Sequence, residues 1–254
     1  MKKTICLVIA LLVLIPLEIG AQSHQSFKGQ LCIMSYNTHN AVGMDGKRDF
    51  KRIASIVAAS NPDIVSLQEL DSVTARNNGV YALKEIAECT GMNYVYGPAI
   101  DYDGGKYGIG ILSKDKPLKV HYVSLPGREE ARTLLIAEYD KFVFLATHFS
   151  LTPEDQVASA KIILKEVASM KKPVFLAGDM NSVPSSKPQK LLCKCFSVLT
   201  DCHWKTCEGE CIDYIYGDKT ARKNYSVSDK KLIEDSMASD HFPVVVTLSV
   251  HENK

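Results

Sequence analysis

The sequence has almost no net charge, because it carries 30 lysine and arginine residues against 29 aspartate and glutamate residues. Lys2, Lys3 and Glu18 lie in the first 21 residues, so the rest of the chain has equal numbers of basic and acidic side chains. Proteins that bind nucleic acid tightly without sequence preference gain most of their affinity by neutralising phosphates. The missing positive charge therefore argues against that class, although a local basic face is still compatible with it.

The chain also lacks an internal repeat, a low-complexity linker and a second apolar run long enough to span a membrane. A bilayer span needs about 20 apolar residues. The composition is 46% hydrophobic and 23% charged, which is typical of a soluble globular protein. We therefore expect one domain from about residue 27 to residue 254, acting as a monomer.

The first apolar run has the features of a secretory leader. Two lysines precede the apolar stretch 5–15, Pro16 ends it, and Ala21 comes before the polar Gln22. This order predicts a signal peptide at residues 1–21 and export to the periplasm or the extracellular space. No transmembrane segment would remain after its removal. The alternative is an uncleaved membrane anchor, for which the stretch is short.

Cysteines are concentrated in one segment. Without Cys6, which lies in the leader, an odd number remains, so at least one thiol has no partner within the chain. Disulfides are the usual state of cysteines in an exported protein, and we predict at least one local disulfide within residues 193–211. A zinc site that includes His203 is the alternative, although the spacings match no common zinc pattern. The cysteines of this segment are Cys193, Cys195, Cys202, Cys207 and Cys211.

Short apolar runs alternate with segments of helical periodicity. Apolar residues recur at helical spacing over 50–57 and again over 83–90, and a third helix is predicted to begin at Thr152 with a hydroxyl cap followed by Pro153. Several predicted strands have no helix between them. This mixture predicts an α/β fold with two packed sheets and helices outside, not a simple parallel array. The predicted strands are 31–36, 64–67, 107–112, 133–139, 142–146, 174–177, 212–216 and 244–248.

Polar or ionisable residues lie at the ends of five predicted strands. Because strand ends at one sheet edge converge, these side chains could share one pocket. Carboxylate and amide oxygens suit a hard cation such as Mg²⁺ or Mn²⁺, and histidines beside carboxylates suit proton transfer near neutral pH. The residues are Asn37, Glu69, His148, Asp179 with Asn181, and Asp240 with His241, and Asp213 adds a carboxylate inside 212–216.

Each of these residues also has an ordinary interpretation. Asn37 could cap a loop, Glu69 could be a surface acid, and His148 could be a core histidine with its hydrogen bonds satisfied. The sequence around Asp179 is also typical of a turn. Their joint occurrence beside buried-looking strands favours the shared pocket.

The same segments resemble, in order, the motifs of the endonuclease/exonuclease/phosphatase superfamily, which includes deoxyribonuclease I, inositol polyphosphate 5-phosphatases and neutral sphingomyelinases. The resemblance covers nearly the whole chain after the leader. It implies a four-layer α/β sandwich of two facing mixed β-sheets flanked by helices. The segments are Met34-Ser35-Tyr36-Asn37, Leu67-Gln68-Glu69, Tyr107–Ser113, Thr147-His148-Phe149, Gly178-Asp179-Met180-Asn181, Ile212-Asp213-Tyr214-Ile215 and Ser239-Asp240-His241-Phe242-Pro243.

The resemblance also implies a metal site that holds Mg²⁺ or Mn²⁺. Glu69 is then the principal metal ligand. Asn37 and Asp240 complete the coordination of the metal, either directly or through water.

The resemblance further implies a role for each catalytic residue. Asp179 and Asn181 orient the attacking water and the phosphate, or hold a second metal. His241 contacts the phosphate or activates water, and Asp213 orients His241. His148 protonates or stabilises the leaving oxygen. Arg132 matches a family arginine near the phosphate pocket.

The expected function is that of an exported, divalent-metal-dependent phosphoesterase. We favour a phosphodiester or phosphomonoester of a small molecule or lipid headgroup as its substrate. A secreted nuclease is an alternative, but the basic segments 187–190 and 219–223 are more typical of solvated surface. A non-catalytic binding module with the same fold is a second alternative.

Overall fold

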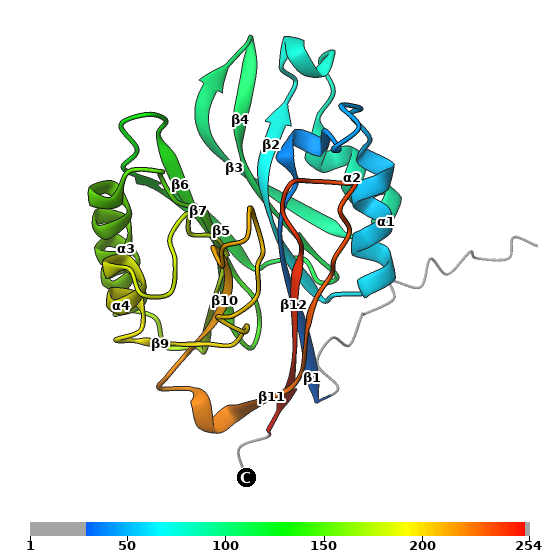
Figure 1. Cartoon of the computed structure of the whole chain (residues 1–254). Coiled ribbons are helices and arrows are strands. Elements are labelled where there is room, and N and C mark those ends of the chain that lie inside the picture. The colour runs from blue at the N-terminus through cyan, green and yellow to red at the C-terminus, as the bar shows by residue number, and fades with distance from the viewer. Residues whose placement is uncertain (1–28, 252–254) are drawn as a thin grey trace, which may run out of the picture.

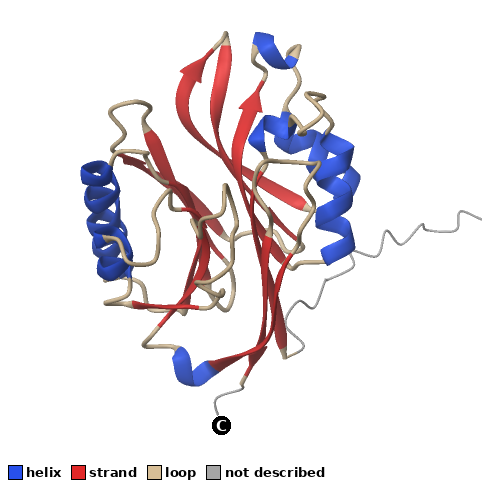
Figure 2. Ribbon diagram, viewed as in Figure 1, coloured by secondary structure: helices blue, strands red, loops and turns tan. Residues whose placement is uncertain are grey.

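The computed structural model describes residues 29–251, and two six-stranded sheets face each other in it (Figure 2). The first sheet contains β1 (Gln30–Asn37), β2 (Ile64–Ser72), β3 (Asn93–Tyr102), β4 (Gly105–Ser113), β11 (Tyr225–Leu232) and β12 (Val244–Val250), in the order β11-β12-β1-β2-β4-β3. The second contains β5 (Lys119–Leu125), β6 (Arg132–Glu138), β7 (Val143–His148), β8 (Val174–Asp179), β9 (Phe196–Val198) and β10 (Asp213–Asp218), in the order β5-β6-β7-β8-β10-β9.

Helices cover the outer face of each sheet (Figure 1). The first sheet is covered by α1 (Phe50–Ser60) and α2 (Ala82–Thr90), and the second by α3 (Pro153–Val167) and α4 (Lys187–Leu192). Each sheet combines parallel and antiparallel pairs. The predicted four-layer α/β sandwich is therefore confirmed. Short 3-10 helices occupy His39–Ala41, Ala75–Asn77 and Arg222–Asn224.

Strands at the centre of each sheet are buried on both faces. In β1, Leu31 and Ile33 belong to the core between the sheets, whereas Met34 and Tyr36 pack with residues of α1 and α2. In β7, Phe144 likewise belongs to the core between the sheets, and its neighbours in sequence pack toward α3. Strands covered on both sides need apolar residues at every position, which explains why they appear in the sequence as continuous apolar runs.

The register of the central strands brings polar residues together at one edge. The parallel strands β7 and β8 place His148 beside Asp179, and the antiparallel strands β8 and β10 place Asp179 opposite Asp213. Gly178 makes this pairing close, because a Cβ atom there would lie 2.0 Å from the carbonyl oxygen of Thr147. A residue with a side chain at this position would push the two strands apart.

Two local predictions differ from the structure. Glu69 does not end its strand, because β2 continues to Ser72 through a bulge between Leu67 and Leu70. Thr152 does stand at the start of α3, but its hydroxyl makes no capping hydrogen bond and donates instead to Glu129 Oε2 at 3.1 Å.

The cysteines in the described residues are all free thiols, so the structure gives no support to the local disulfide predicted for residues 193–211. Their surroundings differ: Cys195 is exposed, whereas Cys211 is buried with its sulfur 3.8 Å from the carbonyl oxygen of Asp201. His203 does not join them either, because its ring is exposed and lies 2.9 Å from Asp201. The zinc alternative therefore has no cluster to support it among residues 29–251.

The predicted signal peptide, residues 1–21, lies outside the described residues. Within residues 29–251, no helix combines the length and apolar character needed to cross a bilayer.

Candidate active site

Asn37 connects the two sheets at the edge where the polar residues converge. Its Nδ2 donates to Glu69 Oε1 at 2.9 Å, in the first sheet, and to Asp179 Oδ2 at 3.0 Å, in the second. Its Oδ1 accepts from the backbone N–H of His39 at 3.1 Å, which fixes the orientation of the amide. The structure thus brings together three residues that are far apart in the sequence.

Glu69 has a strained backbone. Its φ angle of 60° lies in the left-handed region, which residues with side chains rarely adopt and which costs roughly 1–3 kcal/mol. The hydroxyl of Thr38 supports the bulge, because it approaches the carbonyl oxygens of Gln68 at 2.9 Å and Glu69 at 3.2 Å. Bulges of this kind redirect a side chain at functional sites, and here the bulge directs the Glu69 carboxylate toward Asn37.

His241 forms a buried pair with Asp213. Nδ1 of His241 lies 2.9 Å from Asp213 Oδ2, so Nδ1 carries a hydrogen and donates to the carboxylate. Nε2 lies 3.7 Å from Asp179 Oδ2. Burial alone would lower the pKa of His241, but the charge and hydrogen bond of Asp213, together with Cys207 and Asp179, raise it to about 12. His241 is therefore an imidazolium in the protein without metal.

Asp179 is at the centre of the cluster. Burial and the neighbouring carboxylate of Asp213 raise its pKa, against the opposing charge of His241. Its second oxygen, Oδ1, accepts from the backbone N–H of Asn181 at 2.8 Å, and Asn181 has a φ angle of 45°. The Gly-Asp-x-Asn segment is therefore a tight turn, as its ordinary interpretation predicts, and it also directs Asp179 into the cluster.

His148 is held in the opposite protonation state from His241. Its Nδ1 lies 3.2 Å from Nη1 of Arg132, and because arginine can only donate, Nδ1 accepts and Nε2 carries the hydrogen. The hydrogen on Nε2 can go only to Asp179 Oδ2, at 3.5 Å, because the nearer Nδ2 of Asn181, at 3.0 Å, is itself a donor. Burial and the charges of Arg132 and His241 hold the pKa of His148 well below its ordinary value. His148 is therefore a neutral hydrogen-bond donor.

Arg132 is buried beside His148, and two acids that the sequence does not single out surround it. Its Nη1 lies 2.9 Å from Glu130 Oε1, and its Nη2 lies 3.7 Å from Glu129 Oε1. Burial raises the pKa of Glu130, an effect that Arg132 opposes and Glu69 reinforces. Burial and the charges of Glu69 and Glu130 raise the pKa of Tyr107, from β4, and the charge of Arg132 opposes this effect. The only sequence signal for Glu130 is its position two residues before Arg132.

Asp240 is less closely integrated than the other predicted residues. Its side chain is 38% exposed and lies 3.8 Å from Nδ1 of His39 and 3.2 Å from Oγ of Ser239. Ser239 in turn donates to the carbonyl oxygen of Asn37 at 2.8 Å, so the segment is anchored near the cluster. His39 and Ser239 are additions from the structure, and neither follows from strand-end position.

The chemistry of the cluster fits a hard divalent cation. The carboxylates of Glu69, Glu130, Asp179, Asp213 and Asp240 outnumber the cations Arg132 and His241. Asp213 Oδ1 is also buried without a hydrogen-bond partner. Such an excess of carboxylates favours a bound metal ion.

Two subsets of these residues could bind the ion. Asp179, Asp213 and His241 place one ligand atom each within 4.8 Å of one another. His241 is protonated, however, and its Nδ1 is hydrogen-bonded to Asp213, so it cannot ligate in this state. The carboxylates of Glu69 and Asp240 are the better donor set, whereas Asn37 directs its Nδ2, not its oxygen, toward Glu69.

Residues 34–241 match the model of the endonuclease/exonuclease/phosphatase family, and the chain belongs to this family. Among solved structures, an endonuclease/exonuclease/phosphatase from Beutenbergia cavernae is 21% identical, with a TM-score of 0.70 over 88% of this chain and 72% of that one. A family protein from Bacteroides vulgatus is 16% identical, with a TM-score of 0.71 over 88% and 100%. The mannosyl-6-phosphatase of Bacteroides thetaiotaomicron is 19% identical, with a TM-score of 0.66 over 86% and 99%. At these identities the likeness establishes the fold.

Proposed function

We propose that the chain is an exported, divalent-metal-dependent phosphoesterase that hydrolyses a phosphodiester or phosphomonoester by in-line attack of water. One observation carries the proposal. Oδ2 of Asp179 lies 3.0 Å from Asn37 Nδ2, 3.5 Å from His148 Nε2 and 3.7 Å from His241 Nε2. An amide and two histidines, one charged and one neutral, thus face a single carboxylate oxygen.

Each residue has a role that its protonation state supports. Asp179 has a raised pKa, which suits a base that takes a proton from water near neutral pH. His241, as an imidazolium held by Asp213, binds a phosphate oxygen. The neutral His148 donates a hydrogen bond from Nε2 to the leaving oxygen or to the phosphate, and keeps its proton. Arg132 contributes a fixed positive charge beside His148. None of these roles needs a covalent phosphoenzyme.

Glu69 would hold Mg²⁺ or Mn²⁺, with Asn37 and Asp240 acting directly or through water. When bound, the ion would neutralise the charge of the phosphate and stabilise the oxygens of the transition state.

The substrate we favour is a phosphate ester of a small molecule or lipid headgroup. The near-neutral chain argues against a long polyanion, and the structurally similar mannosyl-6-phosphatase makes sugar phosphates the first compounds to test. Export is supported by the leader pattern at residues 1–21.

A substrate panel tests the proposal. The purified chain is assayed with sugar phosphates, nucleotides, phosphoinositides, sphingomyelin and plasmid DNA, in Mg²⁺, in Mn²⁺ and in chelator. We expect metal-dependent hydrolysis of a small ester and no loss of supercoiled plasmid. Glu88→Gln, on the exposed face of α2, is the matched control for Glu69→Gln. Rapid plasmid cleavage would favour the nuclease, and metal binding without any hydrolysis would favour the binding module.

A further inference from the structure

A groove of about 500 Å³ has Asn181 of the catalytic cluster in its lining. The start of α3 forms one wall, the segment between β8 and α4 forms the other, and Glu210 completes the lining. We call it the Asn181 groove. Because Nδ2 of Asn181 is 3.0 Å from Nε2 of His148, one residue of the groove lining contacts the histidine that we assign to the leaving oxygen.

The walls of the Asn181 groove are held in place by several hydrogen bonds. Arg128 binds Asp155 through two nitrogens, at 3.1 and 3.0 Å, and Glu129 accepts from the backbone N–H of Leu151 at 2.7 Å. Gln156 joins the two walls, because its Nε2 donates to the carbonyl oxygen of Asn181 at 2.7 Å as well as to that of Ser150. Binding sites of small ligands are usually preformed in this way.

The lining of the groove combines acids, hydroxyls and aliphatic groups. Glu154 and Glu210 supply carboxylates, and Lys187 is the one basic residue in the lining. Oγ of Ser186, which also lines the groove, is buried without a hydrogen-bond partner. No lining residue is aromatic, so a nucleobase would have no ring to stack on.

We propose that the Asn181 groove binds the alcohol part of the ester and selects an uncharged polyhydroxylated ring, of the hexose or cyclitol type. The inference rests on the proposed phosphoesterase function. Carboxylates accept hydrogen bonds from hydroxyls, whereas they repel a second phosphate. The aliphatic side chains Val157 and Pro188 can pack against the C–H faces of such a ring.

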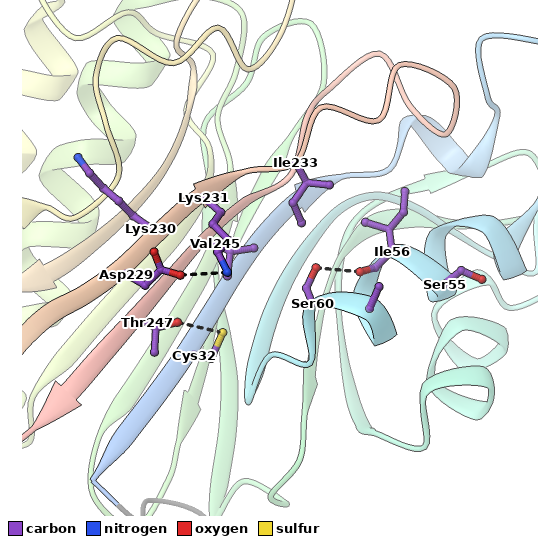
Figure 3. A pocket seen from close by; sticks show the side chains of 11 residues that line it. Cys32, Ser55, Ile56, Ser60, Asp229, Lys230, Lys231, Ile233, Val245 and Thr247 are labelled. Atoms are coloured by element: carbon purple, nitrogen blue, oxygen red, sulfur yellow. Dashed lines mark hydrogen bonds and ion pairs between the residues drawn. The ribbon is translucent and has the colours of Figure 1, made fainter.

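A second cavity, of about 470 Å³, is also lined by an acid, hydroxyls and aliphatic groups (Figure 3). It lies between α1 and the strands β11 and β12, and it contains none of the residues of the catalytic cluster. Its Lys231 is paired with Asp229 at 3.1 Å. Volume and the kinds of lining residue therefore do not distinguish the two cavities, and of the two only the Asn181 groove shares a residue with the catalytic cluster.

Kinetics of matched esters test the inference. The polyol esters are mannose 6-phosphate, inositol 1-phosphate and fructose 1,6-bisphosphate. They are compared with phenyl phosphate, whose alcohol has no further hydroxyl. Each compound is assayed as the phosphomonoester and as its methyl phosphodiester. In the Glu154→Ala/Glu210→Ala double variant we expect KM for the preferred polyol ester to rise about tenfold, since hydrogen bonds to charged groups are lost. We expect KM for phenyl phosphate to change less than about twofold. Glu88→Ala is the control for an exposed acid elsewhere.

A charge-reversing variant gives an independent readout. Glu210→Lys should lower KM for the bisphosphate, because it removes a repulsive charge and adds an attractive one. Two outcomes would overturn the groove assignment alone. One is an equal change in KM for the polyol and phenyl esters in the double variant. The other is wild-type enzyme that cleaves phenyl phosphate but no polyol ester. Wild-type enzyme that cleaves no ester with either metal would overturn the proposed function itself.

Discussion

The two sheets contribute different groups to the same edge of the molecule. The first sheet supplies Asn37, which is 1% exposed, together with Glu69 and the segment with Asp240. This side is open at its outer part, since the Asp240 side chain is 38% exposed. The second sheet supplies Asp179 and Asp213, which are each 1% exposed, together with His148 and Arg132. We infer that the first sheet offers an accessible metal site, whereas the second holds a rigid, buried site for the phosphate.

Two side chains of the candidate site cross between the sheets. Asn37 belongs to the first sheet and donates to Asp179 of the second. His241 precedes β12 of the first sheet and pairs with Asp213 of the second. The active site therefore depends on how the two sheets are packed, and the following variants test each side of this comparison in turn.

The largest effect is expected on the metal side. Glu69→Gln keeps the shape of the side chain but removes its charge, so we expect a loss in kcat/KM on the order of a thousandfold, in line with the several kcal/mol that a catalytic metal supplies. The measurement is turnover against Mg²⁺ concentration, with Glu88→Gln as the control. Full wild-type activity in chelator would contradict metal dependence.

A smaller loss is expected at the histidine that joins the two sheets. His241→Ala should lower turnover on the order of a hundredfold or more, as removal of a general acid or base typically does. Metal affinity, measured by calorimetry, should stay close to that of wild type, because Glu69 and Asn37 are intact. Near-wild-type turnover on a confirmed substrate would mean that the active site is misassigned.

Asp213→Asn should have a milder effect than the loss of His241. The amide can still accept a hydrogen bond from Nδ1, but it no longer favours the charged form of the ring. We expect turnover to fall about tenfold, within the range for a lost charge-assisted hydrogen bond. The pH profile should also move, because the imidazolium would release its proton at lower pH. An unchanged profile would mean that Asp213 serves packing only.

The smallest expected effect is a change in the pH dependence of folding stability at His148, in the second sheet. The pKa of His148 in the folded protein lies below its ordinary value of 6.5, so the unfolded chain binds a proton more readily. His148 therefore stabilises the fold above pH 6.5, and that contribution is lost as the pH falls, by at most about 1.4 kcal/mol per pH unit.

The matched comparison is His148→Gln against wild type, unfolded in urea with chelator between pH 7 and pH 5. The variant should lose less stability on acidification. The raised pKa of Asp179 acts in the opposite direction, because its protonation favours the folded state, but it is present in both proteins. Identical pH dependence in the two proteins would show that His148 is not buried in its neutral form.

The fold is predictable from the sequence where strands are covered on both faces. β7 and β8 are buried along their whole length, and their apolar runs mark them in the sequence. β5 and β11 escape prediction, because most of their residues are exposed or half-buried and leave no apolar run. The helix α4 is only 6 residues long, too short for its periodicity to be recognised.

The candidate site, like the fold, can be predicted only in part from the sequence. Asp179, Asp213, His148 and His241 follow from strand ends in register together with the family resemblance, and the structure brings them together. Glu130 cannot be found in this way, because its importance depends on the direction in which its side chain points within a loop. The bulge at Glu69 is also hidden, since a left-handed residue other than glycine leaves no mark in the sequence.

The central claim is that residues of both sheets act as one catalytic unit. The most direct measurement is a double-mutant cycle of kcat/KM with Glu69→Gln from the first sheet and Asp179→Asn from the second. Residues that act as a unit are strongly non-additive, so the double variant should be no more than about threefold slower than the slower single variant. If the two losses instead multiplied, the sheets would contribute independently, and the claim of a single catalytic unit would be contradicted.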